Sequence, residues 1–323
     1  MKFKFCVGII DAAAADTEHK VDDDDLNSFE YWDRLIASFY STFGRMPTWN
    51  ELTDEQKTFF VQKCIGRDST LDQMQIQREY DEMAGYDLMS ELAIDWLMEI
   101  MRTQLNTDGH DGFYRIEDLL RLDHRVEPMA NGVALIHCLP ARHWIAGQNI
   151  GGEMQLYDGK WTEERDHAVL QAQMAKMLRP KDGENVIKYT YTLCSHQVEE
   201  WECGDLAVAR VGDILSKRDI SWVVYGASKL LRHHSFAIMM SNEYREYPKY
   251  TGDIGKVQWV GGQSVSVELL VCCGMPKHLP RTNWDMSLRP LAQCGMCANM
   301  VHRGDGCSDD LGSVFVCKQC KIE

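Results

Sequence analysis

Residues 197–215 read QVEEWECGDLAVARVGDIL, and this stretch carries the strongest indication of the fold. A polar segment ends at Cys203-Gly204, and an apolar pattern with helical spacing follows at once. A cysteine at the N-terminus of a helix lies at the positive end of the helix dipole, which favours the thiolate. Cys203 is therefore a candidate nucleophile, and it needs an imidazole to take its proton and a carboxylate to orient that imidazole.

Two positions upstream supply these groups at the ends of predicted strands. The apolar run NGVALIHCL at 131–139 predicts a buried strand, and HWIAGQNIGGEMQLYDG at 143–159 predicts two short strands joined at Gly151-Gly152. His143 begins the first of these two strands, and Asp158 follows the second. Each residue alone could be structural, as could Cys-Gly before a helix. Together with Cys203, they supply one candidate for each role of a thiol-dependent active site.

The order His…Asp…Gln…Cys-Gly resembles the SUMO/ubiquitin-like-protein-specific cysteine proteases and the related adenovirus endopeptidase. As in that family, tryptophan follows the histidine, tyrosine precedes the aspartate, and Gln197 lies six positions before Cys203. The resemblance covers about residues 85–240. It departs at Glu202, where the family most often has aspartate, and at Gly159, where it commonly has serine.

The resemblance implies an α+β cysteine protease fold and a role for each residue of the motif. Asp158 would orient His143, His143 would deprotonate Cys203, and Gln197 would stabilise the oxyanion. The resemblance also implies a narrow channel that admits a small residue such as glycine before the cleaved bond. The residues expected to line that channel are Trp144 and Trp96.

The resemblance implies a protein substrate, either a ubiquitin-like protein conjugate or a viral or mobile-element polyprotein. Two other functions remain open. One is a non-catalytic chromatin-associated or protein-binding reader that carries a decayed protease domain. The other is an acyltransferase that passes the acyl group to an acceptor other than water.

The C-terminal part has paired cysteines with the spacing of a zinc site. Cys294-x-x-Cys297 and Cys317-x-x-Cys320 can place four thiolates around one Zn²⁺. A segment this short and this poor in apolar residues needs metal to hold a fold. We therefore expect structural zinc in this segment and no cofactor for catalysis.

With the neighbouring ligands, the pattern resembles a PHD finger, in which two zinc ions are held in a cross-brace. The resemblance implies a second zinc ion, although the adjacent cysteines of its ligand set lack the usual spacing. Met300 stands where such fingers commonly carry an aromatic residue, so we expect a structural or protein-docking module. The ligands expected for the second ion are Cys272, Cys273, His302 and Cys307.

Composition restricts the partners and the compartment. The 323 residues include 34 Lys and Arg against 49 Asp and Glu, a net charge of −15, which argues against broad binding to nucleic acids or anionic membranes. No apolar run has the length of a membrane span. The apolar patch at residues 5–10 ends at Asp11, which is too short for a usual signal peptide. We expect an intracellular protein of the nucleus or cytoplasm.

These observations predict four parts of the chain. They are a helical N-terminal extension at 1–84, a protease domain at 85–240, a connector with some strand character at 241–270 and a PHD-like finger at 271–323. We further expect His137 and Cys138 to be core residues, and His233 and His234 to lie at a surface or interface.

Overall fold

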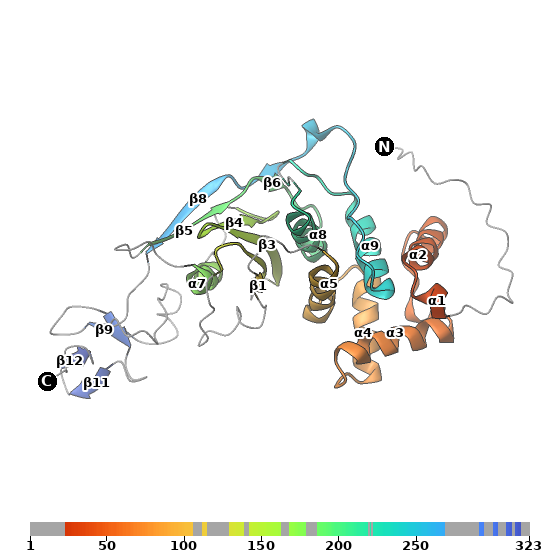
Figure 1. Cartoon of the computed structure of the whole chain (residues 1–323), viewed down its shortest axis with the longest axis horizontal. Helices are drawn as coiled ribbons and strands as arrows, with labels where there is room; N and C mark the ends of the chain where they lie inside the picture. Colours follow the sequence, from red (N-terminus) through yellow and green to blue (C-terminus); the bar gives the residue numbers. More distant parts are fainter. Residues whose placement is uncertain are drawn as a thin grey trace.

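The structure is a computed structural model. It describes residues 23–105, 112–114, 129–138, 142–162, 168–178, 186–218, 220, 222–268, 291–293, 300–302, 308–311 and 314–317. The helices of residues 23–104 gather with those of residues 203–241, and a sheet lies beside them (Figure 1). The described residues therefore form mixed α and β structure, as the sequence predicts.

The N-terminal helices begin and end at capping residues. Thr53 accepts a hydrogen bond from the N–H of Gln56, and Asp72 accepts one from the N–H of Gln75, so both helices start with a capping box. Gly44 ends the preceding helix at φ +71°, which glycine adopts without steric cost. The elements are α1 (Asp23–Leu26), α2 (Phe29–Phe43), η1 (Trp49–Glu51), α3 (Asp54–Arg67) and α4 (Gln73–Ala84).

One hydrophobic core joins these helices to three later ones. The ring of Phe236 stacks on Phe60 with centroids 6.1 Å apart, and it meets Trp32 and Tyr80 edge-on. Such aromatic pairs stabilise by about 0.5–1.5 kcal/mol beyond the area they bury. The helices before residue 85 thus share a core with the helix that begins at Cys203. The later helices are α5 (Glu91–Gln104), α8 (Cys203–Leu215) and α9 (Ser228–Ser241).

The sheet has six strands in the order β1-β2-β3-β4-β5-β8. The turn between β3 and β4 is Gly151-Gly152, with φ of +60° and +91°, so the predicted two-strand hairpin is confirmed. β1–β2 and β4–β5 are parallel, and the other neighbours are antiparallel. The strands are β1 (Gly112–Tyr114), β2 (Gly132–Cys138), β3 (His143–Ile150), β4 (Glu153–Tyr157), β5 (Val186–Tyr191) and β8 (Gln263–Glu268).

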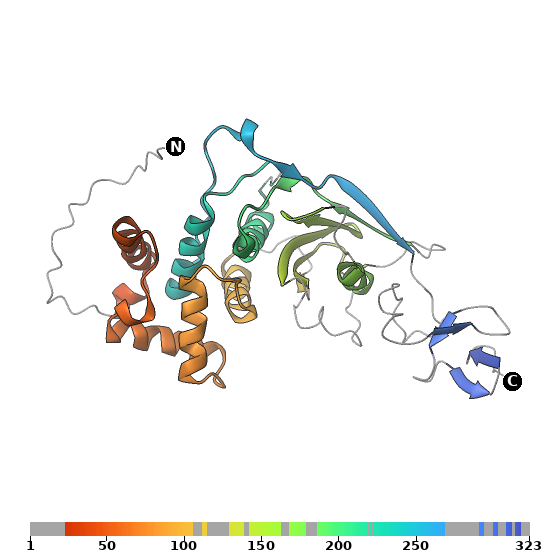
Figure 2. The same cartoon turned by 180° about the vertical axis from the view of Figure 1, so that it is seen from behind.

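Helices cover both faces of this sheet (Figure 2). Because side chains alternate between faces along a strand, Leu135 and Trp144 join the core under α8. Ile136 and Ile145 join a second core under α7 (Ala168–Met177). Residues of β2 and β3 on this face of the sheet therefore pack in the same core as residues of α8.

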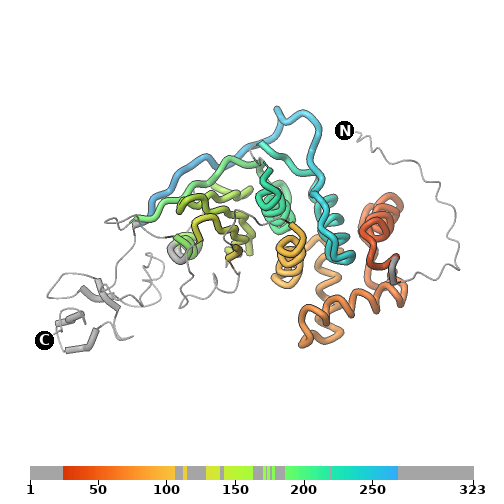
Figure 3. The backbone as a smooth tube through the Cα atoms, in the orientation of Figure 1, coloured from red at the N-terminus to blue at the C-terminus, as the bar shows by residue number. Residues whose placement is uncertain are grey.

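The predicted connector at 241–270 contributes β8 to the sheet. β8 runs antiparallel along β5, from Glu268 opposite Val186 to Gln263 opposite Tyr191, and the two segments lie side by side although they are distant in sequence (Figure 3). The predicted domain boundaries stay a prediction. The remaining elements are η2 (Glu200–Glu202), η3 (Ile254–Lys256), β6 (Cys194–Ser195), β7 (Trp259–Val260), β9 (Leu291–Gln293), β10 (Met300–His302), β11 (Ser308–Leu311) and β12 (Val314–Cys317).

Across the described ranges, no helix combines the length and hydrophobicity that crossing a bilayer requires.

Candidate active site

Cys203 is the first residue of α8, and the turn before it is held by Glu202. Oε1 of Glu202 accepts hydrogen bonds from the N–H groups of Val198 at 2.5 Å and Glu199 at 3.2 Å. Oε2 accepts one from the hydroxyl of Ser228 in α9. Burial raises the pKa of Glu202, and the two backbone donors oppose that rise. These bonds fix the loop before the helix and therefore the position of Cys203.

The thiol of Cys203 is buried, with 2% of the residue exposed. Burial raises its pKa, and the negative charge of Asp205 adds to the rise. Three nearby groups oppose it, namely the backbone N–H of Trp144, the positive charge of Lys160 and the backbone N–H of Gly204. Each of them favours the thiolate over the neutral thiol. The electrostatic surroundings of the sulfur therefore include donors suited to stabilising a negative charge.

His143 and Asp158 form a buried pair at the adjoining ends of β3 and β4. Nε2 of His143 lies 2.7 Å from Oδ1 of Asp158, and both side chains are almost fully buried. The N–H of Lys160 donates to the same oxygen at 3.0 Å. The hydrogen bond engages Nε2, so a proton from another group would have to go to the other ring nitrogen, Nδ1.

The backbone brings this pair next to Cys203. Trp144 directly follows His143, so the N–H that contacts the sulfur belongs to the peptide bond between these two residues. The packing of α8 against β3 produces this approach. The structure thus packs the strand that begins at His143 against the helix that begins at Cys203, and the catalytic roles of His143, Asp158 and Cys203 stay predictions.

Gln197 lies beside the same point, with its amide engaged in the loop. Its backbone N–H donates to the carbonyl of Gly159 at 2.8 Å. Nε2 donates to the carbonyls of Glu199 at 2.7 Å and Glu200 at 3.2 Å. An oxyanion role requires one of these N–H groups to turn toward the substrate, and that role stays a prediction.

The close approach of Gln197 also explains why glycine follows Asp158. A Cβ at position 159 would lie 3.1 Å from Cβ of Gln197 and 3.3 Å from the carbonyl of Ser195. A side chain here would push the Gln197 segment away from Asp158.

The two tryptophans predicted to line a substrate channel lie in different places. The indole N–H of Trp144 donates to the carbonyl of Met89 at 3.2 Å, and its ring stacks on His137 with centroids 4.1 Å apart. Trp96 faces the N-terminal helices, where the guanidinium of Arg67 lies 5.6 Å from its ring. The side chain that packs on the Cys203-Gly204 backbone is Met89, 2.9 Å from the Cβ position of Gly204.

Sequence reasoning did not single out Met89. It also did not assign contacts to two buried arginines, Arg232 and Arg210, which link α8 to other segments. Arg232 bonds Asp205 in α8 at 2.8 Å and the carbonyl of Asp87 at 2.9 Å, so it ties the start of α8 to the segment that carries Met89. Arg210 reaches the ends of β4 and β6 from the same helix. The available signals were a glycine directly after Cys203 and arginines within apolar helix patterns.

Among the residues expected outside the site, His233 differs from its predicted position. Cys138 is buried as predicted, and His137 is mostly buried, with its Nδ1 2.9 Å from a carboxylate oxygen of Glu91. His233 was expected at a surface or interface, but it is buried in α9 and bonds the hydroxyl of Tyr86 at 2.8 Å. Burial lowers the pKa of His233 to about 4. The prediction was wrong because the N-terminal helices cover this face of α9.

The predicted zinc ligands lie mostly outside the described residues. His302 ends β10 and Cys317 ends β12. Within the described ranges no group of three or more metal-binding side chains occurs. Both zinc sites stay predictions. The ligands outside the described residues are Cys272, Cys273, Cys294, Cys297, Cys307 and Cys320.

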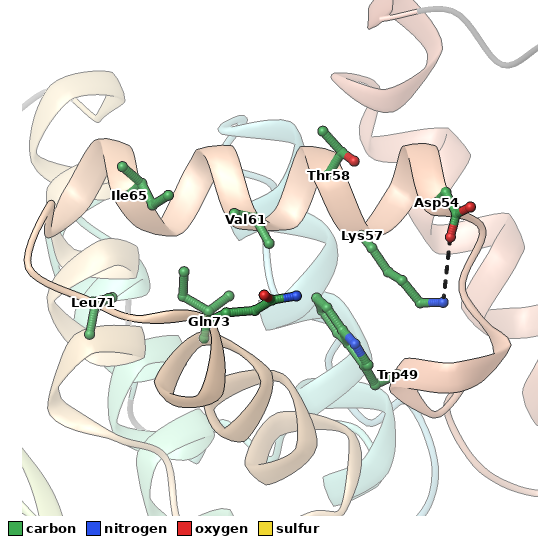
Figure 4. Close-up of a pocket in the computed structure, with 9 residues that line it drawn as sticks. Trp49, Asp54, Lys57, Thr58, Val61, Ile65, Leu71 and Gln73 are labelled. Carbon is green, nitrogen blue, oxygen red and sulfur yellow. Dashed lines mark ion pairs between the residues drawn. The ribbon is translucent and has the colours of Figure 1, made fainter.

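A groove of about 470 Å³ lies between α3 and α4, remote in sequence from these residues (Figure 4). Val61 and Ile65 form one wall, and Lys57 pairs with Asp54 at 3.9 Å along it. None of its lining residues belongs to the predicted site. The lining consists of Trp49, Asp54, Lys57, Thr58, Val61, Ile65, Leu71, Gln73 and Ile76.

Comparisons with known proteins give matches only among solved structures. No protein-family model matches the sequence, and no curated protein matches it. One similar structure is the SUMO protease Ulp1 with its catalytic cysteine oxidised to a sulfonic acid, at 11% identity over 59% of this chain and 96% of that chain, with a TM-score of 0.39. Another is the C-terminal Ulp1 protease domain in complex with Smt3, the yeast orthologue of SUMO, at 12% identity over the same shares, with a TM-score of 0.39. A TM-score below 0.5 does not establish a common fold. A function for this chain therefore has to be argued from the contacts within the chain itself.

Lys160 gives a pH-dependent prediction. Replacing it with glutamine removes a positive charge that favours the thiolate, so the pKa of Cys203 should rise further and the thiol should react more slowly at neutral pH. The rate of Cys203 alkylation by iodoacetamide between pH 6 and pH 10 measures this shift. Lys256→Gln, at an exposed position in η3, is the control. A Lys160→Gln profile that superimposes on the parent profile would contradict the prediction.

Proposed function

We propose that the chain is a cysteine peptidase that hydrolyses a peptide or isopeptide bond after a small residue. The proposal rests chiefly on the buried His143–Asp158 hydrogen bond of 2.7 Å, at the start of a strand that packs against the helix beginning at Cys203. A histidine oriented by a carboxylate beside a cysteine at a helix N-terminus is the arrangement that thiol catalysis requires.

In the proposed reaction Asp158 holds the proton on Nε2 of His143, and Nδ1 takes the proton of the Cys203 thiol. The thiolate attacks the carbonyl carbon of the cleaved bond, and His143 returns the proton to the leaving amine. Water, deprotonated by His143, then hydrolyses the thioester and releases the acid. The backbone N–H of Cys203 and the amide of Gln197 are the proposed oxyanion donors, each worth about 3–4 kcal/mol in such sites.

The packing around the sulfur supports a small residue before the cleaved bond. Met89 lies against Gly204, and Trp144 is held over the same region by its bond to the Met89 carbonyl. A small residue before the cleaved bond would fit beside the closely packed Met89 and Gly204. A Gly-Gly terminus, as in ubiquitin-like proteins, or a glycine-containing polyprotein junction meets this requirement.

The burial of Cys203 is the observation that favours the non-catalytic alternative, because a buried thiol of raised pKa is the usual state of a structural cysteine. One experiment separates the two. Ubiquitin and SUMO probes with a C-terminal electrophile are incubated with the protein, and adducts are mapped by mass spectrometry. A glycine-containing peptide library is tested in parallel.

An adduct on Cys203 would support a peptidase that acts on ubiquitin-like termini. Peptide cleavage without an adduct would support an endopeptidase of the polyprotein type. Neither adduct nor cleavage, from a folded protein, would overturn the proposal in favour of a binding protein. Transfer of the acyl group to an added amine in place of water would identify an acyltransferase.

A further inference from the structure

Arg210 is a buried cation that connects the three chain segments of the proposed site. It lies on α8 two helical turns after Cys203, and only 4% of it is exposed. One guanidinium nitrogen donates to the carbonyl of Tyr157 at 3.1 Å, and the other donates to the carbonyl of Ser195 at 3.3 Å. These carbonyls belong to the ends of β4 and β6.

Both carbonyls lie next to proposed site residues. Tyr157 directly precedes Asp158, and Ser195 lies two residues before Gln197. The guanidinium therefore bonds the backbone carbonyl of the residue directly before Asp158. Arg210 and Asp158 both influence the buried thiol of Cys194, in opposite directions. Burial and the charge of Asp158 raise the pKa of that thiol, and the charge of Arg210 lowers it.

A buried guanidinium is costly unless its charge and its N–H groups find partners. A neutral side chain could pack α8 against the sheet without that cost. An arginine is required where two strand ends must be fixed relative to the helix by a rigid fork of donors.

We propose that Arg210 is a positioning residue of the active site, which sets the place of Asp158 and of the Gln197 segment relative to Cys203. This inference rests on the proposed function and deepens it. Both of its hydrogen bonds go to backbone carbonyls, so it would act without contacting the substrate. It acts through Asp158 and the Gln197 segment.

The test is a double-mutant cycle between Arg210→Met and Asp158→Asn. Arg210→Met should lower kcat about 100-fold with KM within about threefold, because a displacement of about 1 Å at a catalytic group costs this much. In the Asp158→Asn background the same change should cost less than about threefold, because Arg210 then has no carboxylate to position. Arg210→Lys, which keeps the charge and one donor, should recover part of the loss.

Two control measurements separate a loss of folding from a failure of the proposed function. Thermal unfolding shows the temperature range in which each variant is folded, and Arg102→Met, at an exposed position on α5, is the matched control. The rate of Cys203 alkylation by iodoacetamide, measured against pH, needs no substrate. If the chain cleaves none of the tested substrates, the double-mutant cycle between Arg210→Met and Asp158→Asn can be measured with this rate. Arg210 acts electrostatically on Cys194 and Tyr225, and Asp158 and Asp213 respectively act on the same two groups, so all four can affect this profile.

Equal losses from Arg210→Met in the parent and Asp158→Asn backgrounds would overturn the proposal. A loss of activity that follows only the fraction of unfolded protein would also overturn it, because Arg210 would then be a structural residue.

Discussion

Replacing Cys203 with alanine is expected to abolish cleavage while the protein stays folded. Removing the nucleophile from a triad lowers kcat by about 10⁴–10⁶-fold, since the remaining groups supply only substrate binding and oxyanion stabilisation. The sulfur is small and packed against the Trp144 backbone, so its loss should cost only about 1 kcal/mol of the free energy of unfolding. Turnover of the best substrate from the probe and peptide screens, together with thermal unfolding, measures both quantities.

Two other buried cysteines serve as controls for this variant. Cys194 lies in β6, near the same site, and burial raises its pKa as it does for Cys203. Cys64 lies in α3, and burial raises its pKa to about 12. Alanine at either position should leave kcat within about threefold. Full activity in Cys203→Ala, or its complete loss in Cys194→Ala with the fold intact, would show that the nucleophile has been misassigned.

Local patterns in the sequence were sufficient for the elements that carry the site. β2 is a continuous apolar run, and Gly151-Gly152 marks a tight turn, so the strands bearing His143 and Asp158 could be predicted. The helix after Cys203 follows from an apolar pattern that begins directly after Cys-Gly. Local periodicity and turn chemistry act over a few residues, which is why one sequence reveals them.

Contacts between distant segments could not be predicted in the same way. Trp96 lies on a helix with apolar residues on several faces, and nothing in the helical pattern distinguishes the face toward Arg67 from the face toward α8. The burial of His233 depends on Tyr40 and Tyr86, which come from elements far earlier in the chain. The pairing of β8 with β5 likewise depends on tertiary packing.

The roles of Met89 and Gln197 were hidden for a related reason. Met89 contacts Gly204 because Arg232 draws the carbonyl of Asp87 toward α8, and a methionine has no sequence signature for such a contact. The bonds of the Gln197 amide to the Glu199 and Glu200 carbonyls depend on the local fold of the loop, which spacing alone does not specify.

The ion pair between Asp205 and Arg232 should be the largest single contribution of a charged pair to the stability of this site. Both side chains are fully buried, with Nε of Arg232 2.8 Å from Oδ2 of Asp205, and Ser235 donates to the other carboxylate oxygen at 2.8 Å. Arg232→Met leaves a buried carboxylate without its counter-charge, which should lower the free energy of unfolding by about 3–5 kcal/mol. Arg78→Met, from an exposed pair in α4, should cost less than about 1 kcal/mol.

The pH dependence of this loss identifies its cause. Burial raises the pKa of Asp205, and the charge of Arg232 opposes that rise, so removing Arg232 should raise the pKa further. Below the folded-state pKa the carboxyl is protonated and no charge is buried, so the stability lost in Arg232→Met should shrink as the pH falls through that pKa. Urea unfolding of the parent, Arg232→Met and Arg232→Met/Asp205→Asn proteins at pH 7 and at acid pH measures the effect.

The double variant should recover part of the stability at pH 7, because asparagine carries no charge that needs a partner. It should not restore catalysis. Without Arg232 the segment that carries Met89 loses its bond to the start of α8, so the wall beside Cys203 is no longer fixed even in a folded protein. Two results would contradict this prediction: a loss of unfolding free energy in Arg232→Met that does not change with pH, or a larger loss in Arg232→Met/Asp205→Asn than in Arg232→Met. Either would mean that Arg232 stabilises the protein through its bonds to backbone carbonyls and that Asp205 contributes little.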